Sequence, residues 1–218
     1  MIRFKSLVIC MTLVFSVTCV GCATNGLNTE KKVEALRDLG GAHIRQGDLR
    51  LALEKLQEAE SLDPNNAEIH HELGMVYRGL AVYDLSLKHF KRALELKPDF
   101  SEAQNNMGTV YFSLKEWDQA IKCFQKAANS LLYKTPYYAY ENMGQAYYNK
   151  GEYQKAIESY KKSIASAPDY PAPRFWLAKL YLMLDRKDEA VEELKMVMEI
   201  DPNGRFGSEA KELMEGME

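Results

Sequence analysis

Histidine is the side chain of this chain best suited to binding a metal or moving a proton, and the spacing of the histidines argues against both. The chain has 218 residues and four histidines, His43, His70, His71 and His89. His70 and His71 are adjacent, so on a helix their side chains point about 100° apart and cannot face one metal ion together. The sequence also lacks a glycine-rich phosphate loop and a nucleophile elbow. We therefore predict no catalytic residue, no metal site and no cofactor.

The four cysteines are divided between two different kinds of sequence. Cys10, Cys19 and Cys22 lie within the first 22 residues, and Cys123 stands alone beyond them. A single cysteine beside Phe124 in an apolar helical pattern is typical of a small buried thiol. No disulfide is available to the rest of the chain, so its stability must come from packing.

The first 22 residues are organised as a secretion signal. Arg3 and Lys5 precede an uncharged, mostly apolar run over residues 7–20, which is short for a membrane-spanning helix. The run ends at Gly21-Cys22, a small residue before a cysteine. This order resembles the lipobox of a bacterial lipoprotein. An uncleaved N-terminal anchor is the alternative interpretation.

The lipoprotein resemblance carries several implications. Residues 1–21 would be removed, Cys22 would become the lipidated, palmitate-bearing N-terminus, and residues 22–32 would form a short polar tether. Ala23 stands where Asp retains such proteins in the inner membrane, which implies an outer-membrane address facing the periplasm or the cell surface. At no more than about 3.5 Å per residue, the tether keeps the rest of the protein within a few tens of Å of the bilayer.

Beyond the tether, one pattern of small and large residues recurs almost every 34 residues. A Gly or Ala is followed after three residues by a ring, after twelve by Ala or Ser, and after sixteen by a large apolar residue. We call the first of these residues the small anchor of each repeat; the small anchors are Gly40, Gly74, Gly108, Gly144 and Ala178. This pattern and period are the signature of tetratricopeptide (TPR) repeats.

The spacing within one repeat explains the pattern in terms of two helices. In the third repeat, apolar and small residues fall on one helical face from Met107 to Leu114, and again from Trp117 to Ala127. Gly108 and Ala120 lack bulk where the two helices must approach closely. Proline ends the second helix in every repeat except the third. No stretch alternates with period two, so no sheet is expected.

We predict an all-α, right-handed TPR solenoid of five helix-turn-helix repeats. Neither helix of a pair can bury its apolar face alone, so each pair stacks on the next. The predicted repeats are 33–66, 67–100, 101–136, 137–170 and 171–204, and the predicted helix pairs are 33–46/49–62, 67–80/83–96, 101–114/117–130, 137–150/153–166 and 171–184/187–200. Residues 205–218 are predicted to hold a short capping helix near 207–215.

In a TPR solenoid the first helices line a concave groove, and three rows of residues are predicted to face it. The rows lie three residues before, one after and four after the small anchor. The predicted partner-binding residues are Met75, Arg78, Asn105, Thr109, Phe112, Glu141, Gln145, Tyr148, Phe175 and Leu182. Such a groove suits an amphipathic helix or an extended segment held by a few apolar anchors. Packing against neighbouring helices is the alternative role for Leu182 and for Ile44.

Charge further limits the kinds of partner. The chain has 28 Lys and Arg against 31 Asp and Glu, and loss of Arg3 and Lys5 with the signal leaves 26 against 31. A net charge of −5 argues against binding to nucleic acid. We predict a protein partner, no nucleic acid and no small-molecule substrate, and hence a chain that is not an enzyme.

The third repeat contains the most specific local sequence. It is two residues longer than the others and joins the fourth through Leu131-Leu132-Tyr133-Lys134-Thr135-Pro136-Tyr137. An Asn-Asn-Met-Gly helix precedes this joint, and an Asn-Met-Gly helix follows it. The combination resembles the type IV pilus biogenesis/stability lipoproteins, the pilotins of the pilus secretin. The resemblance implies an outer-membrane adaptor that helps secretin subunits reach the membrane and assemble. A general envelope scaffold that recruits periplasmic enzymes, such as cell-wall enzymes, is the alternative function.

Overall fold

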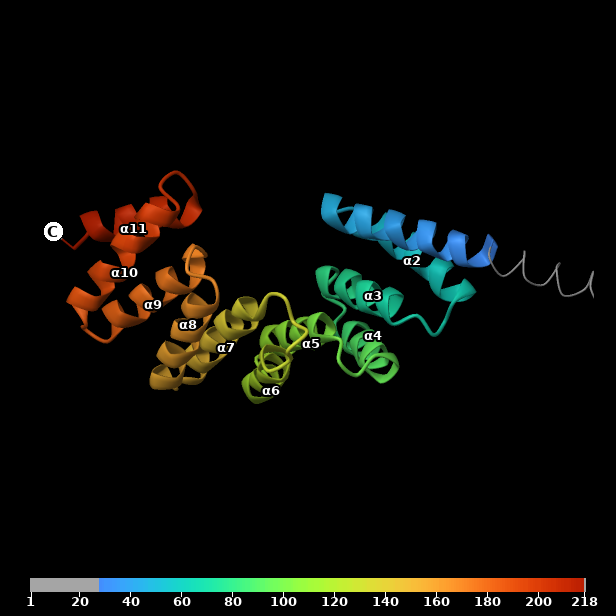
Figure 1. The fold of residues 1–218 in the computed structure, drawn as a ribbon, viewed down its shortest axis with the longest axis horizontal. Coiled ribbons are helices and arrows are strands. Elements are labelled where there is room, and N and C mark those ends of the chain that lie inside the picture. The colour runs from blue at the N-terminus through green and yellow to red at the C-terminus, as the bar shows by residue number, and fades with distance from the viewer. Residues whose placement is uncertain (1–27, 218) are drawn as a thin grey trace, which may run out of the picture. The chain divides into compact units, whose positions relative to one another are not determined.

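The computed structural model describes residues 28–217, so the predicted signal, Cys22 and most of the predicted tether lie outside the described residues. Within the described part, all regular secondary structure is helical, and there is no strand (Figure 1). A first helix covers residues 28–46. It is followed by α2 (Leu49–Leu62), α3 (Ala67–Gly79), α4 (Tyr83–Leu96), α5 (Ser101–Ser113), α6 (Trp117–Ala128), α7 (Pro136–Lys150), α8 (Tyr153–Ser166), α9 (Pro171–Met183), α10 (Lys187–Ile200) and α11 (Arg205–Glu215).

The predicted all-α class and helix-turn-helix architecture are confirmed. The five helix pairs and the C-terminal helix agree with the predicted boundaries to within two residues, with one exception. Residues 28–32, predicted as part of the tether, already belong to the first helix. Lys32 Nζ lies 3.0 Å from Glu58 Oε1 of α2, and Val33 and Leu36 are buried beside it. These contacts favour helix where the polar composition alone predicted none.

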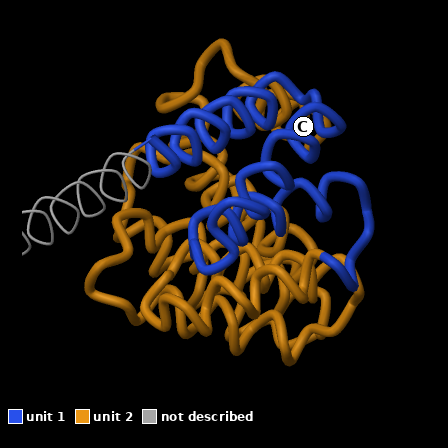
Figure 2. The backbone as a smooth tube through the Cα atoms, turned by 90° about the vertical axis from the view of Figure 1, so that its right-hand side faces the viewer, with its two compact units in different colours: residues 1–85 blue, residues 86–218 orange. Residues whose placement is uncertain are grey.

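The chain divides into two compact units, residues up to Leu85 and residues from Ser86 onward (Figure 2). Unit 1 has a core built from the first helix, α2 and α3. Leu56, Ile69 and Leu73 are completely buried there, and Ile44 and Tyr77 pack against them. Ile44 therefore serves the core, which was the alternative role considered for it.

Unit 2 has two apolar cores along its length. The first joins α6 to α7 and includes Phe124, Tyr133 and Met143. The second joins α8, α9, α10 and α11 and includes Tyr160 and Leu194. In this unit each helix packs against the next from α5 to α11, and the first helices α5, α7 and α9 also lie side by side. This succession of pairs places the predicted groove residues of unit 2 on neighbouring helices.

The small anchors face the large apolar residue of their own second helix. A methyl group built on Gly108 would lie 2.6 Å from Phe124 Cε1, and one built on Gly144 would lie 2.6 Å from Tyr160 Cε1. Real Cβ atoms do not approach a ring so closely, so the two helices meet where the side chain is absent. The predicted pairing of small anchor and large residue is confirmed in these repeats.

The turn between the two helices has one backbone form in all five repeats. One residue adopts a positive φ, and the next residue donates its N–H to the carbonyl five residues back, as in a Schellman-type helix end. The residues with positive φ are Gly47, Ala81, Lys115, Gly151 and Asp185, with φ from 58° to 83°. The accepting carbonyl belongs each time to the ring residue three after the small anchor. The turn thus fixes where the second helix begins.

Two adjacent glycines of the first helix give a matched test of this packing. A methyl group on Gly40 would lie 2.6 Å from Leu56 Cγ, whereas one on Gly41 would have its nearest contact at 3.6 Å. We expect Gly40→Ala to lower the free energy of unfolding by about 1–3 kcal/mol through overpacking. We expect Gly41→Ala to leave it unchanged or to raise it by up to about 1 kcal/mol, because alanine favours helix. Urea denaturation measures both, and equal shifts for the two variants would contradict the assigned register.

Candidate protein-binding surface

The ten predicted groove residues lie on first helices, as their register requires. Met75 and Arg78 belong to α3 in unit 1 and are half-buried. Burial lowers the pKa of the Arg78 guanidinium. The other eight lie on α5, α7 and α9 in unit 2, and we call the side of these helices that carries them the first-helix surface.

Two polar members of the set that lie on α5 form hydrogen bonds within the protein. Asn105 is 9% exposed, and its Oδ1 accepts a hydrogen bond from Asn142 Nδ2 at 3.3 Å, which links α5 to α7. Thr109 Oγ1 donates to the Asn106 carbonyl at 2.7 Å. These two side chains therefore contribute to the packing and local structure of α5, and the accessible part of the surface lies elsewhere.

Phe175 was predicted to face a partner, and the structure shows instead that it is a core residue. It is 1% exposed, and its ring lies 5.4 Å from the ring of Phe206 on α11. The capping helix α11 packs against α9 and α10, so the last first helix has α11 beside it at this position. Leu182 is half-buried and packs against the same core, the alternative role considered for it.

The two aromatic members, Phe112 and Tyr148, remain accessible in part. Phe112 is half-buried, with its ring edge-on to Trp117 at 5.0 Å. Tyr148 is 40% exposed and lies 5.9 Å from the ring of Tyr153. Each of these two rings therefore contacts the first aromatic residue of its own second helix.

A hollow of about 190 Å³ lies between α7 and α9, and two predicted residues line it. It is lined by Gln145, Tyr148, Asn149, Tyr160, Trp176 and Lys179. Gln145 and Tyr148 were predicted. Lys179 lies on a row predicted to face the groove but was not among the ten named residues, and Trp176 and Tyr160 were missed. Trp176 lies two residues before its small anchor, outside the three rows predicted to face the groove. We call this site the α7–α9 hollow.

Charge is arranged unevenly around the α7–α9 hollow. Lys179 is exposed, and its Nζ lies 5.2 Å from the centre of the Trp176 ring. Glu141, a predicted groove residue one turn before Gln145, is half-buried and accepts a hydrogen bond from the Tyr170 hydroxyl at 2.8 Å. Burial raises the pKa of Glu141, and hydrogen bonds from Tyr170 and Trp176 partly offset that rise. The hollow itself is lined by one cation and no acid.

Unit 1 has a hollow at the equivalent place between the first helix and α3. It measures about 460 Å³ and is lined by Arg37, Asp38, Gly41, Arg45, Glu68 and Glu72. Like Trp176, Glu72 lies two residues before its small anchor. Burial raises the pKa of Glu72 to about 7, and its buried Oε2 has no hydrogen-bond partner among the described residues. The same position in the repeat is thus charged in unit 1 and aromatic at the C-terminal end of unit 2.

The joint between α6 and α7 exposes an apolar pair. Leu131 is 102% exposed and Leu132 is 70% exposed, whereas Tyr133 turns inward and is 6% exposed. Beyond it the rings of Tyr137 and Tyr138 lie 4.3 Å apart, and each lies near the ring of Tyr170. Pro136 begins α7 and fixes the end of the joint. The two extra residues of this repeat therefore present leucines to solvent beside a group of tyrosines.

Family models for tetratricopeptide repeats match four overlapping segments of the chain. The matched residues are 147–215, 99–169, 40–80 and 67–100, which together run from residue 40 to residue 215. The chain belongs to the tetratricopeptide-repeat proteins. No curated protein matches the chain by sequence.

Solved structures of other TPR proteins resemble the chain over most of its length. PilW, described as a widely conserved type IV pilus biogenesis factor, is 26% identical with a TM-score of 0.73, and the match covers 79% of each chain. PilF from Pseudomonas aeruginosa is 20% identical with a TM-score of 0.76, covering 86% of each chain, a level that shows the fold alone. MamA is 27% identical with a TM-score of 0.66, covering 75% of this chain and 95% of that one.

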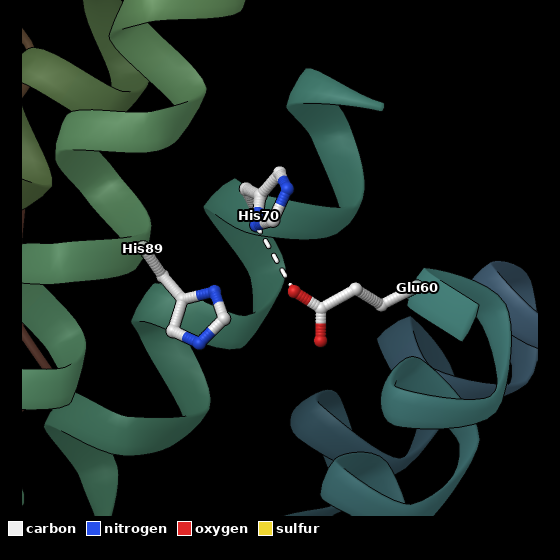
Figure 3. A group of neighbouring side chains, drawn as sticks. All are labelled: Glu60, His70 and His89. Carbon is white, nitrogen blue, oxygen red and sulfur yellow. Dashed lines mark ion pairs between the residues drawn. The ribbon is translucent and has the colours of Figure 1, made fainter. Parts of the chain in front are cut away.

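His70 of this TPR protein is buried, and two local contacts hold its ring. His70 is 5% exposed, its Nε2 lies 3.0 Å from the Pro64 carbonyl, and its Nδ1 lies 3.5 Å from Glu60 Oε1 (Figure 3). Both contacts lie within unit 1 and connect the end of α2 to α3. His89, the third side chain drawn in Figure 3, belongs to unit 2.

Cys123 of the TPR array is a buried free thiol, as predicted. It is 6% exposed, and burial raises its pKa, so the reactive thiolate is disfavoured. In the part of the chain from residue 28 to residue 217, no helix is both long enough and apolar enough to cross a bilayer.

Proposed function

We propose that this TPR protein is a lipid-anchored adaptor of the outer membrane that assists the assembly or localisation of a type IV pilus secretin. The proposal is supported chiefly by the similarity to PilW over 79% of both chains. The joint between the third and fourth repeats, which resembles that of the pilotin lipoproteins, supports it independently. The first-helix surface and the exposed leucines of the joint supply the surfaces on which a protein partner would bind.

In this role the protein acts by binding and not by chemistry. Repeat arrays present extended surfaces to other proteins. Partly exposed aromatic residues such as Tyr148 are the kind of residue that dominates the binding energy of protein interfaces. We therefore infer a scaffold that is not an enzyme and has no small-molecule substrate.

A general envelope scaffold that recruits periplasmic enzymes, such as cell-wall enzymes, is the second candidate function. MamA resembles the chain at 27% identity, about as closely as PilW does. The fold is therefore shared beyond proteins named for the pilus, and the fold alone does not choose between the two functions.

Crosslinking in intact envelopes, followed by purification of the lipidated protein, tests the proposal directly. A secretin subunit enriched well above its share of the envelope proteins supports the pilus function, and enriched cell-wall enzymes without secretin support the alternative. Deletion of the gene is the companion test. The pilus proposal requires fewer secretin multimers and fewer surface pili in the deletion strain, so a normal number of both would exclude it.

Lipidation at Cys22 is a separate prediction. We expect Cys22→Ala to yield a folded protein that is soluble or retained in the inner membrane. The acyl chains of a lipoprotein each contribute about 0.8 kcal/mol per buried CH₂, and the variant would lack them. Membrane fractionation and radioactive palmitate labelling measure the effect, with Cys123→Ala as the control for loss of a thiol. Outer-membrane location and unchanged labelling in Cys22→Ala would show that the lipobox interpretation is wrong.

A further inference from the structure

The α7–α9 hollow combines an apolar body with a single free cation. The rings of Tyr148 and Trp176 form part of its lining, and Tyr160, at 2% exposure, also borders it. At about 190 Å³ it holds roughly six waters at their volume in the liquid. A space of this size takes one large side chain and not a folded element. Release of water from the ring faces favours an apolar occupant.

Lys179 forms no ion pair within the described part of the chain. The residues one turn away from it on α9 are Phe175, Trp176, Leu182 and Met183, none of which is acidic. Arg174, the other cation of α9, is paired with Glu193 at 2.8 Å, whereas Lys179 forms no ion pair with any residue from 28 to 217. Its contacts are with the Phe175 and Trp176 rings. These contacts hold the ammonium at the edge of the hollow, where a carboxylate could reach it.

Tyr160 adds a hydrogen-bond donor that the other repeats lack. The equivalent residues of the other four repeats are Leu56, Phe90, Phe124 and Leu194, which carry no polar group. The Tyr160 ring packs on Gly144, the residue is 2% exposed, and no residue from 28 to 217 hydrogen-bonds to its hydroxyl. Burial raises the pKa of this hydroxyl, so it remains a donor at neutral pH.

We propose that the α7–α9 hollow binds an internal segment of a protein partner in which a large apolar residue stands directly beside Asp or Glu. The apolar side chain lies between Tyr148 and Trp176, and the neighbouring carboxylate pairs with Lys179. The Tyr160 hydroxyl donates a hydrogen bond to a polar atom of the segment. Charge complementarity selects this occupant, because the lining contains one cation and no acid. The inference rests on the protein-binding role proposed above and specifies the chemistry of the partner.

Tryptophan fluorescence of the intact protein, purified in detergent, provides the test. The chain has two tryptophans, so Trp117→Phe leaves Trp176 as the reporter inside the hollow. The probes are acetyl-Gly-Ser-Gly-Leu-Asp-Gly-Ser-Gly-amide and the same peptide with Asn in place of Asp. We expect both peptides to change the Trp176 emission, and the Asp peptide to bind about two- to fivefold more tightly at low salt, as an exposed ion pair allows.

Matched variants test which residues produce the preference for the Asp peptide. Lys179→Met should remove the advantage of the Asp peptide, and Lys179→Glu should transfer it to a peptide with Lys in that position. Lys187→Met, which removes an exposed charge at the start of α10, should change nothing. Tyr160→Phe should fold normally, since Phe124 fills the equivalent position, and should weaken both peptides. Three results would each overturn the proposal. They are equal affinity of the two peptides, a tighter binding of the Asp peptide that survives Lys179→Met, and a Trp176 emission that neither peptide changes.

The outcome is independent of the pilus, because the assay contains no secretin. Normal piliation in a deletion strain together with a Lys179-dependent Asp preference would reject the secretin function and leave the hollow as a binding site. Lost piliation with no Asp preference would reject the hollow and leave the adaptor function.

Discussion

Gly108→Leu is expected to lower the free energy of unfolding by about 1–3 kcal/mol or more, the usual range for overpacking a core. A methyl group alone at this position would lie 2.6 Å from Phe124 Cε1 and 3.1 Å from Cys123 Cβ, and neither can move without opening the contact between α5 and α6. Because α6 packs on α7, hydrogen-exchange protection should fall in both repeats.

Ser113→Leu is the control for Gly108→Leu. It places the same side chain at an exposed position of the same helix, where substitutions usually change stability by no more than about 0.5 kcal/mol. Thermal denaturation compares the two variants. A Gly108→Leu protein that melts with the wild type would show that the third repeat is packed in another register.

The Phe112→Ala/Tyr148→Ala double variant is expected to lose secretin multimers and surface pili while keeping its helical content and membrane location. Both rings lie partly exposed on the first-helix surface, on either side of the joint that resembles the pilotins. Aromatic anchors at such interfaces are worth about 2 kcal/mol or more each, so removal of two should weaken binding several hundredfold or more.

Circular dichroism, fractionation and pilus counts measure the double variant against Met196→Ala. Met196 is 38% exposed on α10, a second helix, and its loss should leave piliation intact. Loss of folding in the double variant would place the two rings in the core. Normal pili from a stably folded double variant would remove this surface from the mechanism.

The sequence predicted the helix boundaries well because one packing rule repeats. The small anchor must meet the large residue of its second helix, and that constraint fixes the register wherever Gly108 meets Phe124 or Gly144 meets Tyr160. The start of the first helix was missed because the contacts that extend it, such as Lys32 with Glu58, are long-range in sequence. The helix propensity of a polar segment depends on its local sequence and does not predict such a contact.

The binding surface was predicted less well because register does not reveal what covers a residue. Phe175 occupies the same row as Asn105 and Glu141, yet α11 packs beside it and buries it. Trp176 and Glu72 were missed because they lie two residues before the small anchor, outside the three rows predicted to face the groove. Only the packing of consecutive first helices shows that this row borders the hollows. The full exposure of Leu131 depends on the path of the joint, which no periodic pattern predicts.

The five intra-repeat turns share one backbone conformation, and this limits where residues can be inserted into such a protein. Each turn places a residue of positive φ seven positions after the small anchor, and three of these residues are not glycine. An insertion within a turn would break the bond to the ring residue and rotate the second helix away from its anchor. The two additional residues of the third repeat lie instead at the joint, where the chain leaves one pair and enters the next. A peptide tag placed between Leu131 and Leu132 therefore has room to extend into solvent, whereas the same tag at Lys115 would displace a whole helix.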